Sequence, residues 1–291
     1  MRHTIRPRRA RTLRRTAAAL AVAALALASA ACGTASGAEK SVADHEAPLV
    51  IGVKADQPGL GQRQGAKDSY DAYTGFDVDI AKYIAAKLGF TTGEVEFRAV
   101  TSGNRESLLR SGAVDMVVAS YSITPERERQ VLFGGPYYVA HQDILVRSSD
   151  TSIRGVKDLA HRKLCKVAGS TSWERVIKEG DVPAVPVAAP DYSACVNLLR
   201  DKKIDAVTTD DLILAGYATA SNGELRVVNA PFSDERYGVG LRKGDVAGCE
   251  AVNKAITSMY QDASAQLLLA QWFGKSGLET TTDVPQFEGC S

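Results

Sequence analysis

Short runs of β-branched residues alternate with amphipathic segments from residue 48 onward, and this alternation restricts the fold more than any other feature of the sequence. Residues 49–54 form an apolar run of strand length. Over 76–88 the apolar residues recur at spacings of three and four, which is typical of a helix, and Gly89 then ends it. The first unit is predicted to contain strands at 49–54, 95–100 and 114–119 and helices at 76–88 and 104–110.

The same order of elements resumes in the second half of the chain. Strands are expected at 142–146, 163–167, 185–188, 206–209 and 225–228, and helices at 173–178, 192–200 and 212–220. A strand at 237–241 and one helical stretch over 246–273 complete the pattern, and this last stretch could return to the first unit. The alternation predicts an α/β protein with mainly parallel sheets flanked by helices. Functional side chains in such folds gather at the carboxyl ends of strands, here the loops after Val53, Val100 and Ala119.

Residues 1–31 have the character of a secretory signal peptide, because seven arginines and no acids accompany an apolar stretch at 17–28. Without them the charge is 28 − 34 = −6, which argues against a nucleic-acid-binding protein. Residues 28–30 suit an ordinary signal peptidase, whereas cleavage before Cys32 would leave a lipidated cysteine, and we favour lipidation. Residues 32–47 then form a flexible tether, so that Cys32 anchors an exported protein to the outer face of the cell membrane.

Signatures of common enzymes do not occur in the sequence. There is no GxSxG, SxxK, HExxH, GxxxxGK[ST] or GxGxxG motif, and after the signal only His45, His141 and His161 remain. A catalytic triad assembled from distant positions stays open as an alternative. We predict no catalytic residue, no cofactor and no metal site.

A run of hydroxyl side chains ends the third strand and leads to an arginine. Residues 119–127 read Ala-Ser-Tyr-Ser-Ile-Thr-Pro-Glu-Arg, and Phe-Gly-Gly-Pro-Tyr-Tyr follows at 133–138. A guanidinium group matches a carboxylate with two parallel hydrogen bonds, and hydroxyl groups can serve the remaining lone pairs. Taken alone, a helix-capping Ser or Thr and a solvated Arg127 explain the block at least as well.

The residues at 119–138 resemble a sequence block of a known protein family. The chain resembles the solute-binding proteins of ABC importers for polar amino acids (family 3), and among them the glutamate-binding lipoproteins most closely. Ser-Ile-Thr-x-x-Arg at 122–127 and Phe-x-x-Pro-Tyr at 133–137 are characteristic of that family, and 52–54, 75–81 and 208–211 match its acidic amino acid members. The resemblance runs from about Leu49 to Phe273.

The resemblance implies a two-lobed periplasmic-binding-protein fold of type II, with two mainly parallel sheets flanked by helices and joined by a two-strand hinge. The strands would cross near residues 140 and 235. Lobe 1 would then comprise 48–140 and 236–291, and lobe 2 would comprise 141–235. The lobes of such proteins close on one ligand by a hinge motion.

The resemblance also implies where the ligand's backbone binds. Arg127 falls on the arginine that holds the α-carboxylate, with Ser122 and Thr171 as further donors. Asp210 falls on the acid that holds the α-ammonium, with Ser120 assisting. A purely structural alternative for Asp210 is a helix N-cap.

Two further cations suggest that the ligand's side chain is anionic. In relatives that take glutamate and aspartate, cations occupy the places of Lys54 and Arg105, so that with Arg127 and Asp210 the site would sum to 3 − 1 = +2. Tyr192 stands where some acidic amino acid binders have a histidine. Glutamine and asparagine therefore stay open as ligands, as does a plain surface position for Lys54 or Arg105.

Cysteine usage fits an exported lipoprotein, because Cys32 leaves an even number of thiols. Four cysteines allow three pairings. We predict Cys165 with Cys195 and Cys249 with Cys290, since each pair closes a loop of about 30 to 41 residues within one lobe. Buried reduced thiols are the alternative, and a zinc site is less favoured.

The sequence thus predicts a receptor, expected to be monomeric, that captures a free acidic amino acid, glutamate or aspartate, and delivers it to a membrane permease with a separate ATPase. The alternatives are a glutamine- or asparagine-binding receptor, a secreted enzyme of the dehydratase kind on the same fold, and a sensory input to a membrane partner.

Overall fold

The computed structural model describes Met1, residues 40–65 and residues 69–291. Residues 2–31 of the expected signal peptide, the lipidation site Cys32 and the first half of the expected tether, 32–39, therefore lie outside the described residues. The second half, 40–47, packs on the fold and is not a flexible linker, because Val42 is 4% exposed and the Ser41 hydroxyl donates to Asp245 at 2.5 Å. Lys40–Ser291 form one compact unit. No helix in the described part of the chain combines the length and the apolar character needed to cross a membrane.

The central element is a seven-stranded sheet with the order β10-β7-β12-β6-β1-β5, in which β11 also pairs with β7. Two small sheets accompany it, β2-β3-β4 and β8-β9. The main strands are β1 (Leu49–Val53), β5 (Val95–Ala99), β6 (Met116–Val117), β7 (Val131–Arg147), β10 (Val207–Asp210), β11 (Leu225–Val227) and β12 (Ser233–Arg242). The others are β2 (Asp56–Gln57), β3 (Gly61–Arg63), β4 (Tyr73–Thr74), β8 (Lys163–Val167) and β9 (Val185–Ala189).

Helices flank these sheets, and the longer ones follow the predicted spacing of apolar residues. They are α2 (Phe76–Lys87), α3 (Arg105–Arg110), α4 (Pro125–Glu128), α5 (Ser172–Glu174), α6 (Tyr192–Arg200), α7 (Asp211–Ala220), α8 (Val246–Gln261) and α9 (Ser264–Phe273). A π-helical turn, η5 (Arg175–Glu179), continues α5, and short 3-10 turns lie at Val42–Asp44, Tyr70–Ala72, Thr92–Glu94 and Val156–Leu159.

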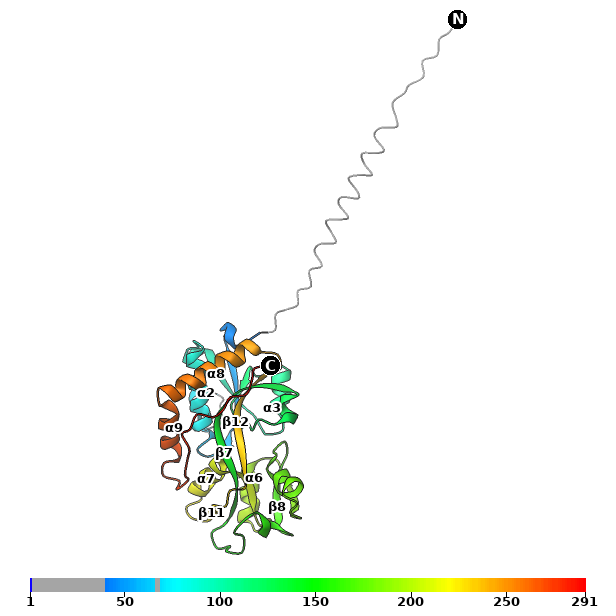
Figure 1. Ribbon diagram of the computed structural model, residues 1–291, viewed down its shortest axis with the longest axis vertical. Coiled ribbons are helices and arrows are strands. Elements are labelled where there is room, and N and C mark those ends of the chain that lie inside the picture. The colour runs from blue at the N-terminus through cyan, green and yellow to red at the C-terminus, as the bar shows by residue number, and fades with distance from the viewer. Residues whose placement is uncertain (2–39, 66–68) are drawn as a thin grey trace. The chain divides into compact units, whose positions relative to one another are not determined.

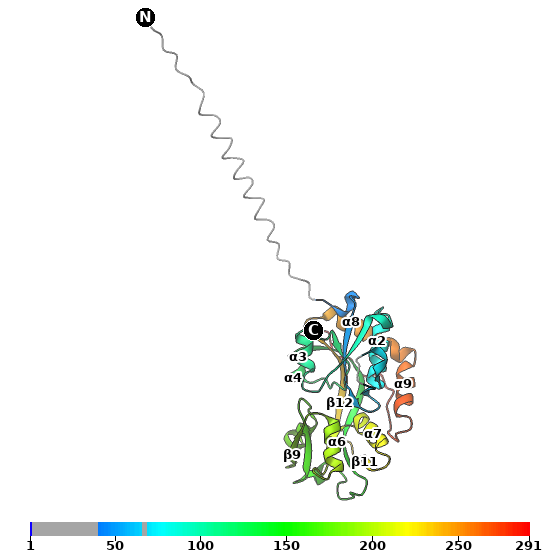
Figure 2. The ribbon, with the colours of Figure 1, turned by 180° about the vertical axis from the view of Figure 1, so that it is seen from behind.

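The long antiparallel pair β7–β12 connects two lobes, as Figures 1 and 2 show. Parallel pairing of β1 with β5 and β6 builds the first lobe, and the parallel pair β8–β9 belongs to the second. The two-lobed α/β fold with a two-strand hinge is therefore confirmed. The pairing differs from the expectation in one respect, because antiparallel contacts of β6 and β10 with the hinge strands merge the lobes' main strands into one sheet.

The hinge strand β7 is much longer than the strand expected at 142–146. Gly134, Gly135 and Pro136 hide its first half in the sequence, because glycine and proline are unfavourable in strands. A Cβ atom on Gly134 would lie 2.7 Å from the Cγ1 atom of Val252. This glycine therefore lets α8 pack closely onto the strand.

The predicted helical stretch over 246–273 is wrong as a single element, because it breaks between α8 and α9. Ala263 has a left-handed backbone with φ +63°, and Asp262 accepts a hydrogen bond from the Ser264 amide at 3.1 Å. Trp272 on α9 donates its indole N–H to Asp79 on α2 at 2.8 Å. The end of the chain thus returns to the first lobe, as expected.

The structure contains both predicted disulfides, Cys165–Cys195 and Cys249–Cys290. Most apolar side chains of the helices and strands are buried, although Leu267 on α9 is 68% exposed. Burying one such large apolar side chain stabilises the fold by about 1.5–3 kcal/mol. In the first lobe, β1 packs against α2 through Leu49, Ile51, Val53, Phe76, Ile80 and Ile84, each at most 1% exposed.

Candidate ligand-binding site

A polar pocket lies where loops of the two lobes meet. Its space is about 240 Å³, open solvent at the mouth included. Seven of the eight predicted ligand-binding residues line it, and the eighth, Lys54, lies behind Ser102. The lining consists of Ser102, Arg105, Ser120, Ser122, Arg127, Ser170, Thr171, Ser172, Tyr192, Thr209, Asp210 and Ile213.

Strand ends place most of these side chains. Arg105 begins α3 after β5, and Ser120 and Ser122 follow β6. In the second lobe, Tyr192 begins α6 after β9, and Asp210 ends β10. The pocket therefore forms where the carboxyl ends of the strands converge, as the α/β pattern predicts.

Arg127 is held by both lobes. Its Nη1 donates to the Ser122 carbonyl oxygen at 2.6 Å, and its Nη2 donates to the Gly169 carbonyl oxygen across the cleft at 3.0 Å. Glu106 lies 3.6 Å from its Nε. Burial, followed by repulsion from Arg105, lowers the pKa of Arg127 to about 10, so the guanidinium is charged at neutral pH. The solvated position considered from the sequence is therefore wrong for Arg127.

The capping part of that structural alternative is correct. Thr124 accepts a hydrogen bond from the Arg127 amide at 3.3 Å, and Pro125 occupies the first position of α4. A proline with its fixed φ suits a first helical turn, where its missing N–H costs nothing. The Ser-Ile-Thr-Pro segment thus starts a short helix that points Arg127 into the pocket.

Arg105 is 1% exposed, so it is not a surface charge. Its Nη1 donates to the carbonyl oxygens of Ala119 at 3.0 Å and Ser120 at 3.2 Å, and its guanidinium lies 4.1 Å from the centre of the Tyr121 ring. Its buried Nε has no hydrogen-bond partner among the described residues. A buried donor of this kind is costly to leave unsatisfied, which favours an acceptor on a ligand.

Lys54 is also buried, at 3% exposed, and its ammonium donates to the Ser102 hydroxyl at 2.7 Å. Burial, followed by repulsion from Arg105, lowers the pKa of Lys54 to about 7. Ser102 lines the pocket, so Lys54 reaches the ligand space through that hydroxyl.

Ser120 has a left-handed backbone with φ +41°, which is unusual for a residue other than glycine. Such a conformation costs on the order of 1 kcal/mol and often marks a functional site. Asp77, fully buried on α2, accepts the Ser120 amide hydrogen at 2.7 Å, and the Ser120 hydroxyl donates to Gln57 at 3.0 Å. Burial raises the pKa of Asp77 to about 6.

Asp210 is 4% exposed and accepts a hydrogen bond from the Tyr237 hydroxyl at 2.6 Å. Burial, and then the charge of Glu235, raise its pKa well above the ordinary range. Asp210 occupies the N-cap position of α7, but its side chain makes no capping hydrogen bond. The N-cap alternative therefore does not account for this carboxylate.

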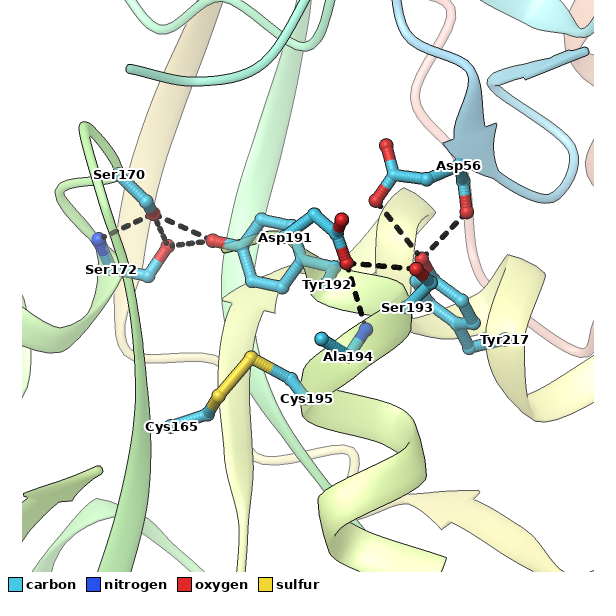
Figure 3. Close-up of a disulfide and its surroundings, with 10 residues drawn as sticks. All are labelled: Asp56, Cys165, Ser170, Ser172, Asp191, Tyr192, Ser193, Ala194, Cys195 and Tyr217. Carbon is cyan, nitrogen blue, oxygen red and sulfur yellow. Dashed lines mark hydrogen bonds between the residues drawn. A yellow bond between two sulfur atoms is a disulfide. The ribbon is translucent and has the colours of Figure 1, made fainter. Parts of the chain in front are cut away.

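The second lobe adds a group of hydroxyls, shown in Figure 3. Tyr192 shares hydrogen bonds with Ser170 at 2.6 Å and Ser172 at 3.0 Å. Cys195 follows on the same helix and joins Cys165 of β8, so the disulfide ties Tyr192 to the strand that leads to Ser170. This wall can donate to or accept from a ligand.

More charges surround the site than the sequence expectation counted. Beyond the four residues that sum to 3 − 1 = +2, the acids Asp77, Glu106 and Glu235 lie close to the site cations and to Asp210, and Arg175 pairs with Glu235 at 2.9 Å. Repulsion and burial act through neighbours in space, which residue spacing does not reveal. The preference for an anionic side chain therefore depends on where Lys54 and Arg105 lie, not on total charge.

Several lining residues were missed from the sequence. Ser170 and Ser172 flank the predicted Thr171 at the carboxyl end of β8, and Thr209 precedes Asp210, so the strand-end rule could have found them. Ser102 was equally visible after β5. Ile213, in the first turn of α7, carries no such signal.

Comparisons with known proteins agree with this geometry. The chain matches the family model of bacterial extracellular solute-binding proteins, family 3, over residues 49–275. A glutamate-binding protein of Corynebacterium glutamicum is 39% identical over 265 residues, 87% of this chain and 88% of that protein. The ABC transporter glutamine-binding protein of Bacillus subtilis is 32% identical over 232 residues, 79% of this chain and 83% of that protein.

A solved structure extends the comparison to three dimensions. It is an ancestral amino-acid-binding protein, described as a precursor of cyclohexadienyl dehydratase, with a TM-score of 0.70 and 30% identity over 80% of this chain and 100% of that one. The family match spans both lobes and every residue that lines the pocket. The chain therefore belongs to the bacterial extracellular solute-binding proteins of family 3.

Proposed function

We propose that this protein captures a free acidic amino acid, L-glutamate in the first place, and delivers it to an ABC permease driven by a separate ATPase. One observation carries the proposal: Arg127 of the first lobe and Asp210 of the second, a buried cation and a buried acid, line the same pocket. A zwitterion needs one partner of each sign. The relatives that bind glutamate and glutamine support the ligand class.

The α-carboxylate would bind at Arg127. Its Nη1 and Nη2 each carry two hydrogens, and the carbonyl oxygens of Ser122 and Gly169 use one apiece. The remaining pair can form the parallel hydrogen bonds that suit a carboxylate, with the hydroxyls of Ser122 and Thr171 as further donors. Asp210, assisted by the Ser120 hydroxyl, would accept the α-ammonium.

The ligand's side-chain carboxylate would lie near Ser102, between Lys54 and Arg105. The unsatisfied Nε of Arg105 and the ammonium of Lys54 behind Ser102 support this placement. Glutamine or asparagine is the second candidate, because Tyr192 and its serine neighbours offer neutral hydrogen-bonding groups on the opposite wall. We assign no catalytic residue, cofactor or nucleic-acid partner.

The same proposal includes the protein's organisation and place in the cell. Lobe 1 would comprise 48–140 and 236–291, and lobe 2 would comprise 141–235, with the hinge at β7 and β12. After removal of residues 1–31, a lipidated Cys32 and the tether from it to residue 39 would hold the monomeric receptor at the outer face of the membrane, since residues 40–47 pack on the fold.

Calorimetric titration tests this function. The protein is unfolded and refolded to remove bound ligand, then titrated with glutamate, aspartate, glutamine and asparagine. We expect the tightest binding for glutamate, loss of binding to all four in Arg127→Ala, and a much larger loss for glutamate than for glutamine in Arg105→Gln. Arg129→Gln, at the C-cap of the helix that carries Arg127 but exposed and paired with Glu126, is the control and should bind like the wild type. Binding of none of these ligands by the wild type would overturn the proposal.

A further inference from the structure

Two tyrosines of the hinge strands each bind a buried carboxylate beside the pocket. Tyr137 lies on β7 and Tyr237 on β12, their ring centres are 5.9 Å apart, and they are 1% and 0% exposed. The Tyr137 hydroxyl donates to Asp77 of the first lobe at 2.8 Å, and the Tyr237 hydroxyl donates to Asp210 of the second at 2.6 Å. Both hinge strands therefore reach the site through a carboxylate.

The two contacts differ in one way that decides which tyrosine matters for the ligand. Asp210 lines the pocket itself. Asp77 does not, and it contacts the pocket only through Ser120, whose amide N–H donates a hydrogen bond to the Asp77 carboxylate. Tyr237 is not among the residues that line the pocket, and its hydroxyl reaches the ligand space through Asp210. Its backbone also pairs with that of Ser122, so the test must change the hydroxyl alone.

Asp210 lies among groups of both signs. Glu235 on β12 and Asp211 on α7 disfavour its negative charge, and Arg127 on α4 favours it. The charge of Asp210 in turn contributes to raising the pKa of Tyr137 on β7 and of Tyr192 on α6. A hydrogen bond to the ionised form of a carboxyl stabilises that form. The Tyr237 hydroxyl makes such a bond and thereby lowers the pKa of Asp210, against the larger upward effect of burial and Glu235.

We propose that Tyr237 is a positioning residue, whose hydroxyl holds the Asp210 carboxylate ionised and oriented toward the α-ammonium of the ligand. The inference rests on the proposed function only for the ammonium-binding role of Asp210. It is independent of the ligand's side chain, because glutamate and glutamine present the same α-ammonium.

The test is the dissociation constant of Tyr237→Phe for L-glutamate and L-glutamine between pH 4.5 and 8. Loss of a hydrogen bond to a charged group should weaken both ligands about 10- to 100-fold at pH 7. The pH below which binding fails should also move upward, because Asp210 without its donor takes up a proton more readily. Tyr260→Phe is the matched control, since its hydroxyl donates to the Tyr137 backbone oxygen at 2.9 Å, and it should leave both constants and the pH profile unchanged.

A double variant separates positioning from a general structural effect. In an Asp210→Ala background, which leaves the Tyr237 hydroxyl no acceptor at position 210, Tyr237→Phe should weaken binding no further, since the hydroxyl acts through the carboxylate. Equal weakening with and without Asp210, or an unchanged pH profile in Tyr237→Phe, would overturn the inference.

Failure of the proposed function and failure of the role of Tyr237 give different results, which the wild type and a second variant distinguish. Failure of the wild type to bind either ligand would contradict the proposed function, whereas normal binding by Tyr237→Phe contradicts only the role of Tyr237. Should Tyr237→Phe not fold, 4-aminophenylalanine at this position, which keeps a donor on the ring, should retain the wild-type constants within about threefold. Loss of binding in that folded protein would overturn the inference.

Discussion

Lys54 is a side chain whose burial opposes stability. The residue is 3% exposed, its ammonium donates to the Ser102 hydroxyl, and burial lowers its pKa from 10.5 to about 7. The unfolded chain therefore binds one more proton than the folded chain between about pH 7 and 10.5, and the free energy of unfolding rises with pH across that window. Burial of Lys54 thus lowers the free energy of unfolding at neutral pH, as expected for a residue that serves ligand binding and not folding.

We therefore predict that Lys54→Met stabilises the ligand-free protein at pH 7 and removes this rise of stability with pH, which for one group is at most about 1.4 kcal/mol per pH unit. The same variant should bind glutamate less tightly while affecting glutamine little. Urea unfolding at pH 7 and pH 9, with and without ligand, measures both effects. A Lys54→Met protein that is less stable at pH 7 would contradict the burial argument.

Motifs reveal a residue more readily than its buried partners. Arg127 and Asp210 were predictable because each stands in a recognisable block at a strand or helix end. Asp77, Glu235 and Tyr237 act on the site from other elements. Asp77 stands in the recognised block 75–81, but nothing in that block indicates its contact with Ser120, and no recognised block contains Glu235 or Tyr237. Their effect on charge and orientation arises only when the chain is folded.

At the scale of elements, the loop after β8 lies in close contact with the loop after β5 beside the pocket. Gly169, in the loop after β8, has φ +74°, and a Cβ atom there would lie 2.4 Å from the Ser102 carbonyl oxygen of the first lobe. The carbonyl oxygen of the same glycine accepts the bond from Arg127. Only a residue without a side chain allows this approach of the two lobes.

Gly169→Ala should consequently weaken binding of every ligand by at least about tenfold, because both the left-handed backbone and the contact oppose closure. Gly155→Ala is the control, since its extended backbone has no neighbour within 4 Å of the added Cβ. Titration calorimetry gives the constants, and unaltered binding in Gly169→Ala would show that closure does not need this contact.

The two disulfides should differ in their effect on binding. Replacing Cys165 and Cys195 by alanine should cost about 3 to 4 kcal/mol of stability for a loop of 30 residues. It should also weaken binding, because that bridge ties Tyr192 to the strand leading to Ser170. Replacing Cys249 and Cys290, which join α8 to the end of the chain, should lower stability alone. Urea unfolding and titration of both double variants check this, and equal effects on binding would contradict it.

Elements with a clear period of apolar residues were predictable within a few positions, as α2, β8 and α6 illustrate. The first half of β7 was not predictable. The glycine that allows α8 to pack closely on this strand is typical of a loop when it is seen in the sequence alone. The break between α8 and α9 was also hidden, because a left-handed alanine carries no sequence signal. Packing against other elements decides these cases.

In the whole molecule, the two lobes already touch around the pocket. Arg127 bonds to Gly169, and the Tyr217 hydroxyl of α7 donates to the Asp56 carbonyl oxygen of β2 at 2.6 Å. The two-lobed architecture followed from the alternation of strands and helices together with the family resemblance. The merging of the strands into one sheet did not, because the sequence does not reveal which edges of separate units pair.

The most direct test of the account is a crystal structure of the protein with L-glutamate. The account predicts the α-carboxylate on Arg127, the α-ammonium on Asp210, and the side-chain carboxylate beside Ser102, within reach of Lys54 and Arg105. Glutamate in the reverse orientation, with its side-chain carboxylate on Arg127, or bound outside this pocket would contradict it.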